Sequence, residues 1–257
     1  MLRKLVRWVE SRGIARRPRI GSMATMPARA ESFARVLPAV ATQVERLYLY
    51  LDGFASVPDS VRAFANVVPL LAHEHGDLHA AGRFLPLTMM REPCVFIVFD
   101  DDILYPPTYV HEIVGGLAAF AGRAVVGYHA NVFRPPYQSY VRDRHCYHFA
   151  AALAAPRPVH SVGAGTAAFD SARLSFDPAA WPRIRGNDLM LATEAERHGL
   201  PRIALARAAG WLAPLRELQP DSVYAALLAD DRQQTAMVKA LLEMNSGRSL
   251  NGVPAAP

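Results

Sequence analysis

Cysteine is scarce in this chain. The 257 residues include only Cys94 and Cys146, which cannot supply the disulfide framework of a small secreted protein. The segment before residue 20 is too rich in arginine to hold the apolar core of a signal peptide. We therefore expect a protein of the reducing cytoplasm.

Long hydrophobic runs are also missing. A membrane-spanning helix needs roughly 18 or more consecutive apolar residues, and the most apolar stretches, 113–120 and 149–155, are shorter. Internal repeats and low-complexity linkers are absent as well. With 51% hydrophobic residues, the chain can still bury one sizeable core, so we expect one soluble domain.

Lysine is the third scarcity. Lys4 and Lys239 are the two lysines, so arginine supplies nearly all of the positive charge behind the net charge of +5. Together with the abundance of alanine, this is typical of a GC-rich genome rather than of a nucleic-acid-binding surface. We expect no nucleic-acid partner.

Positive charge is concentrated near the amino terminus, between Arg3 and Arg19. Two interpretations of this segment stay open. A basic amphipathic helix would rest on anionic lipid and give peripheral contact with the inner face of the cell membrane, whereas an ordinary terminal helix would pack on the domain. The apolar residues at helical spacing are Leu2, Leu5, Val6 and Val9.

Apolar β-rich runs alternate with amphipathic segments along the first half of the chain. Such alternation is typical of α/β proteins with βαβ units and a mostly parallel sheet, in which ligands bind beyond the carboxyl ends of the strands. Thr25, Asp52 and Asp100 are all expected at that edge. The expected strands are 20–25, 46–51, 66–71, 95–99 and 124–128, with helices over 33–40 and 110–117.

The second half is less regular. Ser161–Phe169 is expected to form a glycine-interrupted strand, and 187–198 a helix. Asn187 is expected to cap that helix, with Asp188 in its first turn. The tail is expected to hold one or two helices between 221 and 244.

Three consecutive aspartates, Asp100, Asp101 and Asp102, directly follow the apolar run 95–99 and are called the aspartate run below. Adjacent carboxylates repel one another unless a cation or hydrogen-bond donors offset the charge. Mg²⁺ and Mn²⁺ prefer such oxygen ligands and often take one or two carboxylates plus substrate phosphates. The alternatives are a divalent-cation site and an acidic surface turn without metal.

The segment 99–107, FDDDILYPP, resembles the DXD motif of nucleotide-sugar glycosyltransferases with the GT-A fold, particularly glycosyltransferase family 2. The resemblance extends over most of residues 18–212. It implies a mostly parallel central sheet flanked by helices in a single domain. We expect this domain at 18–215, between a basic helical segment at 1–17 and a helical extension at 216–257.

The resemblance also implies a set of donor and metal ligands. Asp100 and Asp102 would hold Mn²⁺ or Mg²⁺, and Asp100 and Asp101 would also reach the donor. For Arg83 the alternatives are contact with a phosphate or the base and an exposed charge on a helix. The remaining donor-binding candidates are Thr25, Pro27 and Arg29 after the first strand, Asp52 at the nucleotide base, and Asp77 in the stretch that contacts nucleotide and sugar.

Residues downstream of the aspartate run resemble the acceptor side of the same family. Asp188 matches the general base of inverting members, although the family more often has Glu-Asp where this chain has Asn-Asp. The alternative is a helix-terminal aspartate stabilised by the helix dipole. Trp211 would either close the active site or belong to the core. Gly163, Gly165 and Thr166 match the strand that lines sugar and acceptor.

Histidines leave further alternatives open. No histidine follows position 198, so water or phosphate oxygens would replace the late histidine that many family members add to the metal shell. His73, His75 and His79 are spaced closely enough for a transition-metal site. His145 and His148 would line an acceptor wall or belong to a partly buried hairpin.

These features predict a metal-dependent, inverting glycosyltransferase that moves a sugar from a UDP-linked donor to a glycan or lipid-linked acceptor in bacterial surface-polysaccharide synthesis. One rival is a nucleotidyltransferase, which typically opens with a glycine-rich basic phosphate loop, whereas 20–29 contains one glycine. Another is a catalytically silent binding subunit of a polysaccharide assembly complex. Intact Asp100, Asp102 and Asp188 argue against the silent subunit, and only activity separates it from the glycosyltransferase.

Overall fold

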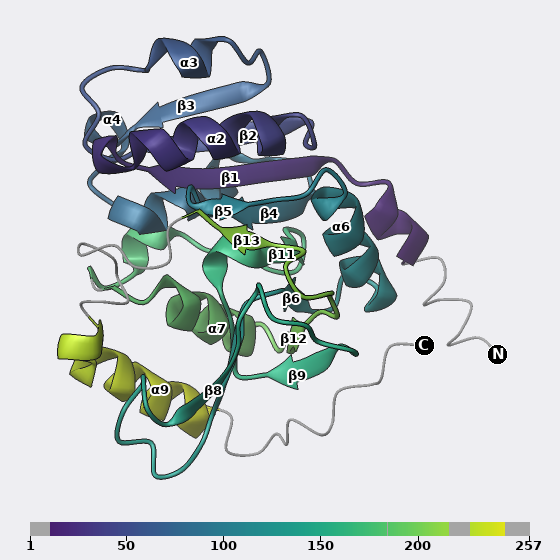
Figure 1. Cartoon of the computed structure of the whole chain (residues 1–257), viewed down its shortest axis with the longest axis vertical. Coiled ribbons are helices and arrows are strands. Elements are labelled where there is room, and N and C mark those ends of the chain that lie inside the picture. Colours follow the sequence, from purple (N-terminus) through teal and green to yellow (C-terminus); the bar gives the residue numbers. More distant parts are fainter. Residues whose placement is uncertain (1–10, 184, 216–226, 245–257) are drawn as a thin grey trace.

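A central sheet organises the chain (Figure 1), which is described here from a computed structural model covering residues 11–183, 185–215 and 227–244. Within these residues the sheet has eight strands in the order β3-β2-β1-β4-β11-β6-β12-β9. The strands are β1 Arg19–Thr25, β2 Arg46–Leu51, β3 Val67–Leu71, β4 Val95–Phe99, β6 Val125–Gly127, β9 Arg157–Val159, β11 Ala167–Asp170 and β12 Arg202–Ala204.

The sheet is mostly parallel, as expected. Strands β3, β2, β1 and β4 pair in parallel, and β12 pairs in parallel with β6. Strand β11 runs antiparallel to both β4 and β6, and β9 runs antiparallel to β12. Because β11 is reversed, its beginning lies at the same edge as the end of β4. The predicted α/β class is therefore confirmed.

Helices and short helical turns cover the sheet and its edges. The α-helices are α2 Ala30–Ala41, α3 Asp59–Arg62, α4 Ala72–His75, α5 Pro86–Met89, α6 Tyr109–Ala119, α7 Asn187–Arg197 and α9 Arg232–Met244. The 3-10 turns are η1 Pro27–Arg29, η2 His79–Phe84, η3 Ala164–Thr166 and η4 Pro178–Ala180.

Strand β4 is buried on both faces, which explains its uninterrupted apolar sequence. Val95, Ile97 and Phe99 pack in the same cluster as α2 and α6 on one side. Phe96 and Val98 pack with α7 on the other side. The aspartate run is therefore attached to a strand whose five residues are all buried, which fixes its backbone.

A smaller sheet and a short ribbon lie beside the central sheet. Strands β7 Ala130–Phe133, β8 Arg144–Tyr147 and β10 Ser161–Val162 form a three-stranded antiparallel sheet. Strand β13 Ala213–Pro214 pairs with β5 Ile103–Leu104, directly after the aspartate run. The hairpin alternative for His145 is thus confirmed, because that residue pairs with Val132 across β7 and β8.

The described residues of the two segments that flank the expected domain, 11–17 and 227–244, pack against it. Ile14 is buried in the main core, and the Ser11 hydroxyl donates to the Ala118 carbonyl at 2.7 Å. Helix α9 packs Val238 and Leu241 against α7. The residues 2–9 of the predicted basic helix lie outside the described residues, so membrane contact stays a prediction. No helix among the described residues is long and apolar enough to cross a membrane.

Two local predictions were wrong. Ser161–Phe169 is not one strand, because β10 ends at Val162 and η3 intervenes before β11. This turn lets the glycine-containing segment approach the aspartate run. The N-cap of helix α7 is Gly186 rather than Asn187, because Asn187 is already the first residue of the helix. Asp188 does lie in the first turn, as expected.

Candidate active site

The predicted ligand edge exists, and three elements converge on it. Thr25 ends β1, Asp52 follows β2, and Asp100 follows β4. Parallel pairing places these ends side by side: Thr25 is opposite Leu51 of β2, and Met23 is opposite Phe99 of β4. The amide of Asp52 also donates to the Thr25 carbonyl at 2.9 Å.

Asp100 forms an ion pair with Arg83, which comes from η2. Arg83 is 8% exposed, so the alternative of an exposed helix charge was wrong. Its Nε also donates to the Ala80 carbonyl at 2.9 Å, and the Ser22 hydroxyl donates to the Arg83 carbonyl. Burial and these bonds hold the guanidinium at the end of β4, where it offsets part of the charge of the aspartate run.

The other two carboxylates of the aspartate run have partners in the loop after β1. The Thr25 hydroxyl donates to Asp101 Oδ2 at 2.7 Å, and Arg29 Nη1 lies 3.3 Å from Asp102 Oδ2. Thr25 and Arg29 thus contact the aspartate run, and Pro27 opens the turn that carries Arg29. Their contact with a donor stays a prediction.

The partners do not fully offset the negative charge. Burial, followed by repulsion from Asp100 and Asp101, raises the pKa of Asp102 to about 7. Burial also raises the pKa of Asp101, although the Thr25 hydrogen bond opposes this shift. Part of this charge is therefore left for a cation, and oxygen donors of this kind suit Mg²⁺ or Mn²⁺.

The glycine-containing segment lies directly against the aspartate run. A Cβ atom at Gly165 would overlap the Asp100 carboxylate. Tyr105 joins the two segments, because its hydroxyl donates to the Gly165 carbonyl and accepts from the Asp100 amide at 2.8 Å. Gly165 is therefore needed for close approach. Tyr105 was not singled out in the sequence, where it reads as one more apolar residue after the motif.

Asp188 contacts the same glycine-containing segment. Its Oδ1 accepts from the Ala164 amide at 2.8 Å, and no donor in the described part of the chain bonds to its Oδ2. Burial is the largest cause that raises its pKa, and the charge of Asp100 adds to this. A carboxylate with a raised pKa and one free oxygen is suited to accept a proton.

Gly163 and Thr166 shape the segment rather than facing open space. The hydroxyl of Thr166 accepts from the His129 amide at 2.9 Å and is buried. The Gly163 amide donates to the His129 carbonyl at 2.7 Å, and a Cβ at Gly163 would meet the His129 side chain at 2.9 Å. Contact of Gly163 and Thr166 with substrate stays a prediction.

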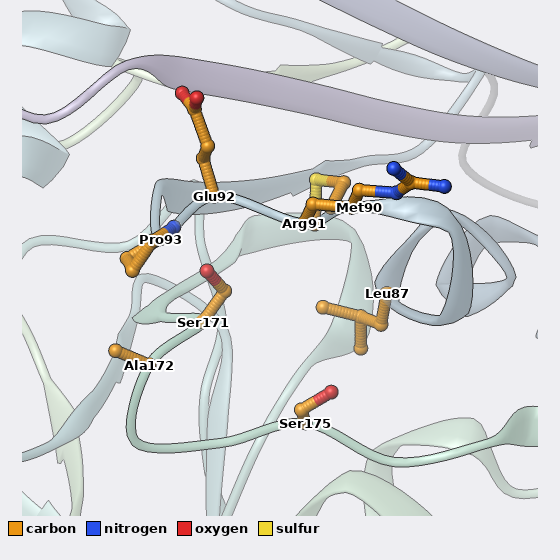
Figure 2. Close-up of a pocket in the computed structure, with 8 residues that line it drawn as sticks. All are labelled: Leu87, Met90, Arg91, Glu92, Pro93, Ser171, Ala172 and Ser175. Carbon is orange, nitrogen blue, oxygen red and sulfur yellow. The ribbon is translucent and has the colours of Figure 1, made fainter.

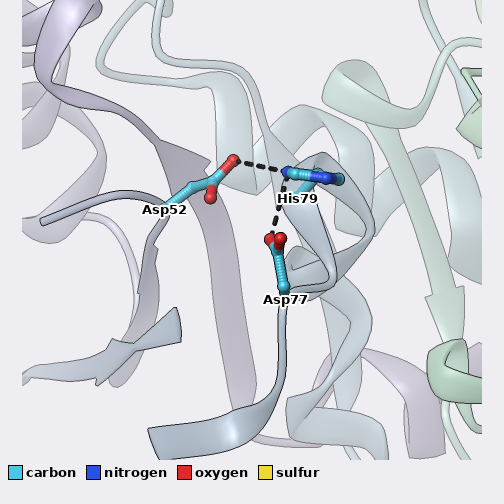
Figure 3. Close-up of side chains that lie close together, drawn as sticks. All are labelled: Asp52, Asp77 and His79. Atoms are coloured by element: carbon cyan, nitrogen blue, oxygen red, sulfur yellow. Dashed lines mark hydrogen bonds and ion pairs between the residues drawn. The ribbon is translucent and has the colours of Figure 1, made fainter. Parts of the chain in front are cut away.

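Asp52, Asp77 and His79 meet beside the strand edge (Figure 3). His79 Nδ1 lies 3.1 Å from Asp77 Oδ1 and 3.4 Å from Asp52 Oδ2. Among the described residues this is the one group of three potential metal ligands in mutual reach. His79 thus groups with the two aspartates rather than with His73 and His75. The His79 side chain is 66% exposed, and exposed acidic groups of this kind are common without a metal ion.

Trp211 lies at the rim of the main core. Its ring contacts Tyr128 at 4.8 Å and stacks on Tyr109 at 5.9 Å between centroids. The chain that follows passes over the aspartate run, because the Leu215 amide donates to the Asp102 carbonyl at 2.8 Å. These contacts agree with the alternative that Trp211 belongs to the core. Its contact with substrate stays a prediction.

A hollow of about 160 Å³ lies away from this edge. Figure 2 shows it between the segment that precedes β4, with Glu92 and Pro93, and the turn that follows β11, with Ser171 and Ser175. It therefore lies at the opposite end of β4 from the aspartate run. None of the predicted site residues lines it.

Comparison with known proteins places the fold but not the activity. No protein-family model and no curated protein matches the chain. One solved structure that matches is described as glucosyl-3-phosphoglycerate synthase from Mycobacterium tuberculosis with Mn²⁺, uridine diphosphate and glucosyl-3-phosphoglycerate. It is 15% identical with a TM-score of 0.48, over 96% of this chain and 84% of that chain.

A second solved structure is described as a mycobacterial protein. It is 15% identical with a TM-score of 0.50, over 97% of this chain and 80% of that chain. At this identity the likeness concerns the fold alone. The mostly parallel sheet flanked by helices agrees with the GT-A fold that the sequence resemblance implies.

Proposed function

We propose that this protein is a metal-dependent glycosyltransferase that transfers a sugar from a nucleoside diphosphate donor, UDP-linked, to an acceptor hydroxyl. The observation that carries the proposal is the contact of Asp100 and Asp188 with adjacent residues, Gly165 and Ala164, of one glycine-containing segment. One carboxylate belongs to a group that favours a cation, and the other is suited to accept a proton.

The donor would lie along the edge formed by β1, β2 and β4. Asp52, with Asp77 beside it, would meet the nucleoside, and Arg29 and Arg83 would lie near the diphosphate. Asp100 and Asp102 would hold Mn²⁺ or Mg²⁺, with water and phosphate oxygens as further ligands. When bound, such an ion stabilises the negative charge that develops on the leaving diphosphate.

Asp188 would act as the general base of an inverting reaction. The acceptor oxygen would attack the anomeric carbon while the bond from that carbon to the diphosphate oxygen breaks. The acceptor proton would pass to the Asp188 carboxylate, and the nucleoside diphosphate would leave. The free Oδ2 of Asp188 and its raised pKa both support this role.

The proposal extends to the acceptor and to the place of the enzyme in the cell. A glycan or lipid-linked acceptor and a part in bacterial surface-polysaccharide synthesis fit a cytoplasmic enzyme, with membrane contact through the basic amino-terminal segment.

Metal-dependent nucleotide binding tests the proposal most directly. We expect UDP with Mn²⁺ to raise the melting temperature, because a ligand at 100 times its Kd adds about 2.7 kcal/mol to the free energy of unfolding. UDP alone should give a smaller shift. Equal shifts with and without Mn²⁺, or none with any nucleoside diphosphate, would contradict the proposed function.

A charge-matched pair of variants locates the metal site. Asp102→Asn should abolish the Mn²⁺-dependent part of UDP binding measured by titration calorimetry. Asp59→Asn is the control, because Asp59 is fully exposed on α3 and carries the same charge. Wild-type affinity in Asp102→Asn would remove Asp102 from the metal site.

A further inference from the structure

Arg144 is a partly buried cation without an anionic partner. It begins β8, and its guanidinium carbon lies 4.3 Å from the centroid of the Tyr140 ring. No carboxylate among the described residues forms an ion pair with it. Tyr140 also hydrogen-bonds to the Arg144 side chain. This bond and the cation–π contact orient the guanidinium and leave its other N–H groups for a ligand.

Other arginines around the candidate site have their charge or donors satisfied within the protein. Arg29 and Arg83 each form an ion pair with one aspartate of the aspartate run. Arg207 donates to the carbonyls of His148, Ala151 and Leu205. Arg144 has no such bond: Asp188 offsets its charge only through space. Because a partly buried charge is costly without a directly bonded opposite charge, the contrast indicates that an anion from outside the chain binds Arg144.

Arg144 and the proposed general base, Asp188, are connected through one apolar cluster. Tyr140, beneath the guanidinium, packs in the same apolar cluster as Leu189, which directly follows Asp188 in α7. Strand β8 pairs with β7, which continues from His129, and the His129 carbonyl accepts from the Gly163 amide. Arg144 and Asp188 therefore lie on two elements that share one packed cluster.

Electrostatics agree with this proximity. The charges of Asp188 and Arg144 act in opposite directions on the pKa of Tyr140 and on that of Cys146. His129 does not add a second cation, because burial lowers its pKa to about 3. Arg144 therefore supplies positive charge beside the Asp188 carboxylate at neutral pH.

We propose that the acceptor is itself an anion, a carboxylate or a phosphate monoester, which Arg144 binds while the acceptor hydroxyl faces Asp188. This inference rests on the proposed glycosyl transfer and adds the class of acceptor. A guanidinium presents two parallel N–H groups to carboxylate or phosphate oxygens, which fixes orientation as well as affinity.

Calorimetric titration with three small probes tests the anion site. Glycerol 3-phosphate and D-glycerate carry the two candidate anions, and glycerol is the neutral control. Saturating UDP and Mn²⁺ are present so that the probes do not occupy the donor phosphate site. One or both anions should bind at least about 10-fold more tightly than glycerol, the scale of a charged hydrogen bond. The tighter of the two identifies the group.

Three variants assign the effect to Arg144. Arg144→Gln should raise the Kd of the favoured anion about 10-fold or more, and Arg144→Lys should lose less because it keeps the charge. Arg142→Gln is the matched control, since Arg142 is exposed on the same hairpin. None should change the Kd of UDP with Mn²⁺, which also shows that each variant is folded.

The outcomes separate this inference from the proposed function. Anions that bind no more tightly than glycerol, or an unchanged Kd in Arg144→Gln, would overturn the anion site. Failure of the wild-type protein to bind UDP with Mn²⁺ would overturn the donor proposal instead. In that case the same titrations without nucleotide still decide whether Arg144 binds an anion.

Discussion

The two sides of the candidate site treat charge differently. On the donor side, formed by the ends of β1, β2 and β4, each carboxylate of the aspartate run has a partner from a neighbouring segment. On the acceptor side, formed by the β7–β8 hairpin and the start of α7, Arg144 and one oxygen of Asp188 have no such partner. On the donor side the charged groups pair with one another within the protein. On the acceptor side Arg144 and one oxygen of Asp188 are left to bind a ligand.

Asp188→Asn should have the largest effect on function. Because the amide cannot accept the acceptor proton, we expect turnover to fall by roughly 100-fold or more. The Kd of UDP with Mn²⁺ should change little, because Asp188 belongs to the acceptor side. Steady-state rates and calorimetry measure the two quantities. Wild-type turnover would reduce Asp188 to a structural residue at a helix start.

Replacing one arginine from each side tests the comparison through stability. Arg83→Ala leaves Asp100 without its ion-pair partner and should lower the free energy of unfolding by about 3 kcal/mol, the lower end of the range for a broken buried pair. Arg144→Ala loses one cation–π contact and should cost less than about 1 kcal/mol. Urea unfolding measures both. Equal losses would show that Arg144 is structural too.

Gly165→Ala tests how closely the two sides must approach. The added Cβ would displace the Asp100 carboxylate, and overpacking of this kind costs about 1–3 kcal/mol. Weaker binding of UDP with Mn²⁺ should accompany the loss. Gly115→Ala is the control, because a Cβ there, within α6, meets no atom within 4 Å and should raise helix stability by about 0.5–1 kcal/mol.

The pH dependence of stability should show the smallest effect. The folded-state pKa of Asp102, about 7, lies above its ordinary value, so the folded protein binds the proton more tightly than the unfolded chain does. The stability that this proton contributes is present below the ordinary pKa and is lost as pH rises toward 7 and beyond. Asp102→Asn should therefore become more stable relative to wild type across this window.

Chelator-containing buffer is required for that comparison, since Mn²⁺ would offset the negative charge. Taking the difference between variant and wild type also removes the opposite contribution of His129 and His160, whose pKa values burial lowers. A pH-independent difference between variant and wild type in urea unfolding would argue against the charge repulsion described for the aspartate run.

Much of the donor side was predictable because it depends on regular local patterns. A buried parallel strand requires an apolar run, and the residues after such runs meet at one sheet edge, so Thr25, Asp52 and the aspartate run were placed correctly. The burial of Arg83 was left open, because a single arginine in a polar segment gives no sign of the carboxylate it will meet.

The acceptor side was less predictable because it depends on contacts between distant segments. The turn η3 breaks the expected strand so that Gly165 reaches Asp100, and no local pattern distinguishes it from a glycine within a strand. Arg144 and Tyr105 were not singled out, since their roles follow from a hairpin register and from a hydroxyl that bridges two segments.

The sequence by itself determined the α/β alternation, the buried strand before the aspartates and the unfavourable charge of three adjacent carboxylates. These follow from periodicity and from covalent neighbours, which are local. Only the tertiary structure decided which arginines form ion pairs with the aspartate run. It also decided that Asp188 and Asp100 contact the same glycine-containing segment, and that Arg144 forms no ion pair. Charge pairing acts through space, between side chains that are 17 residues apart for Arg83 and Asp100 and 73 residues apart for Arg29 and Asp102.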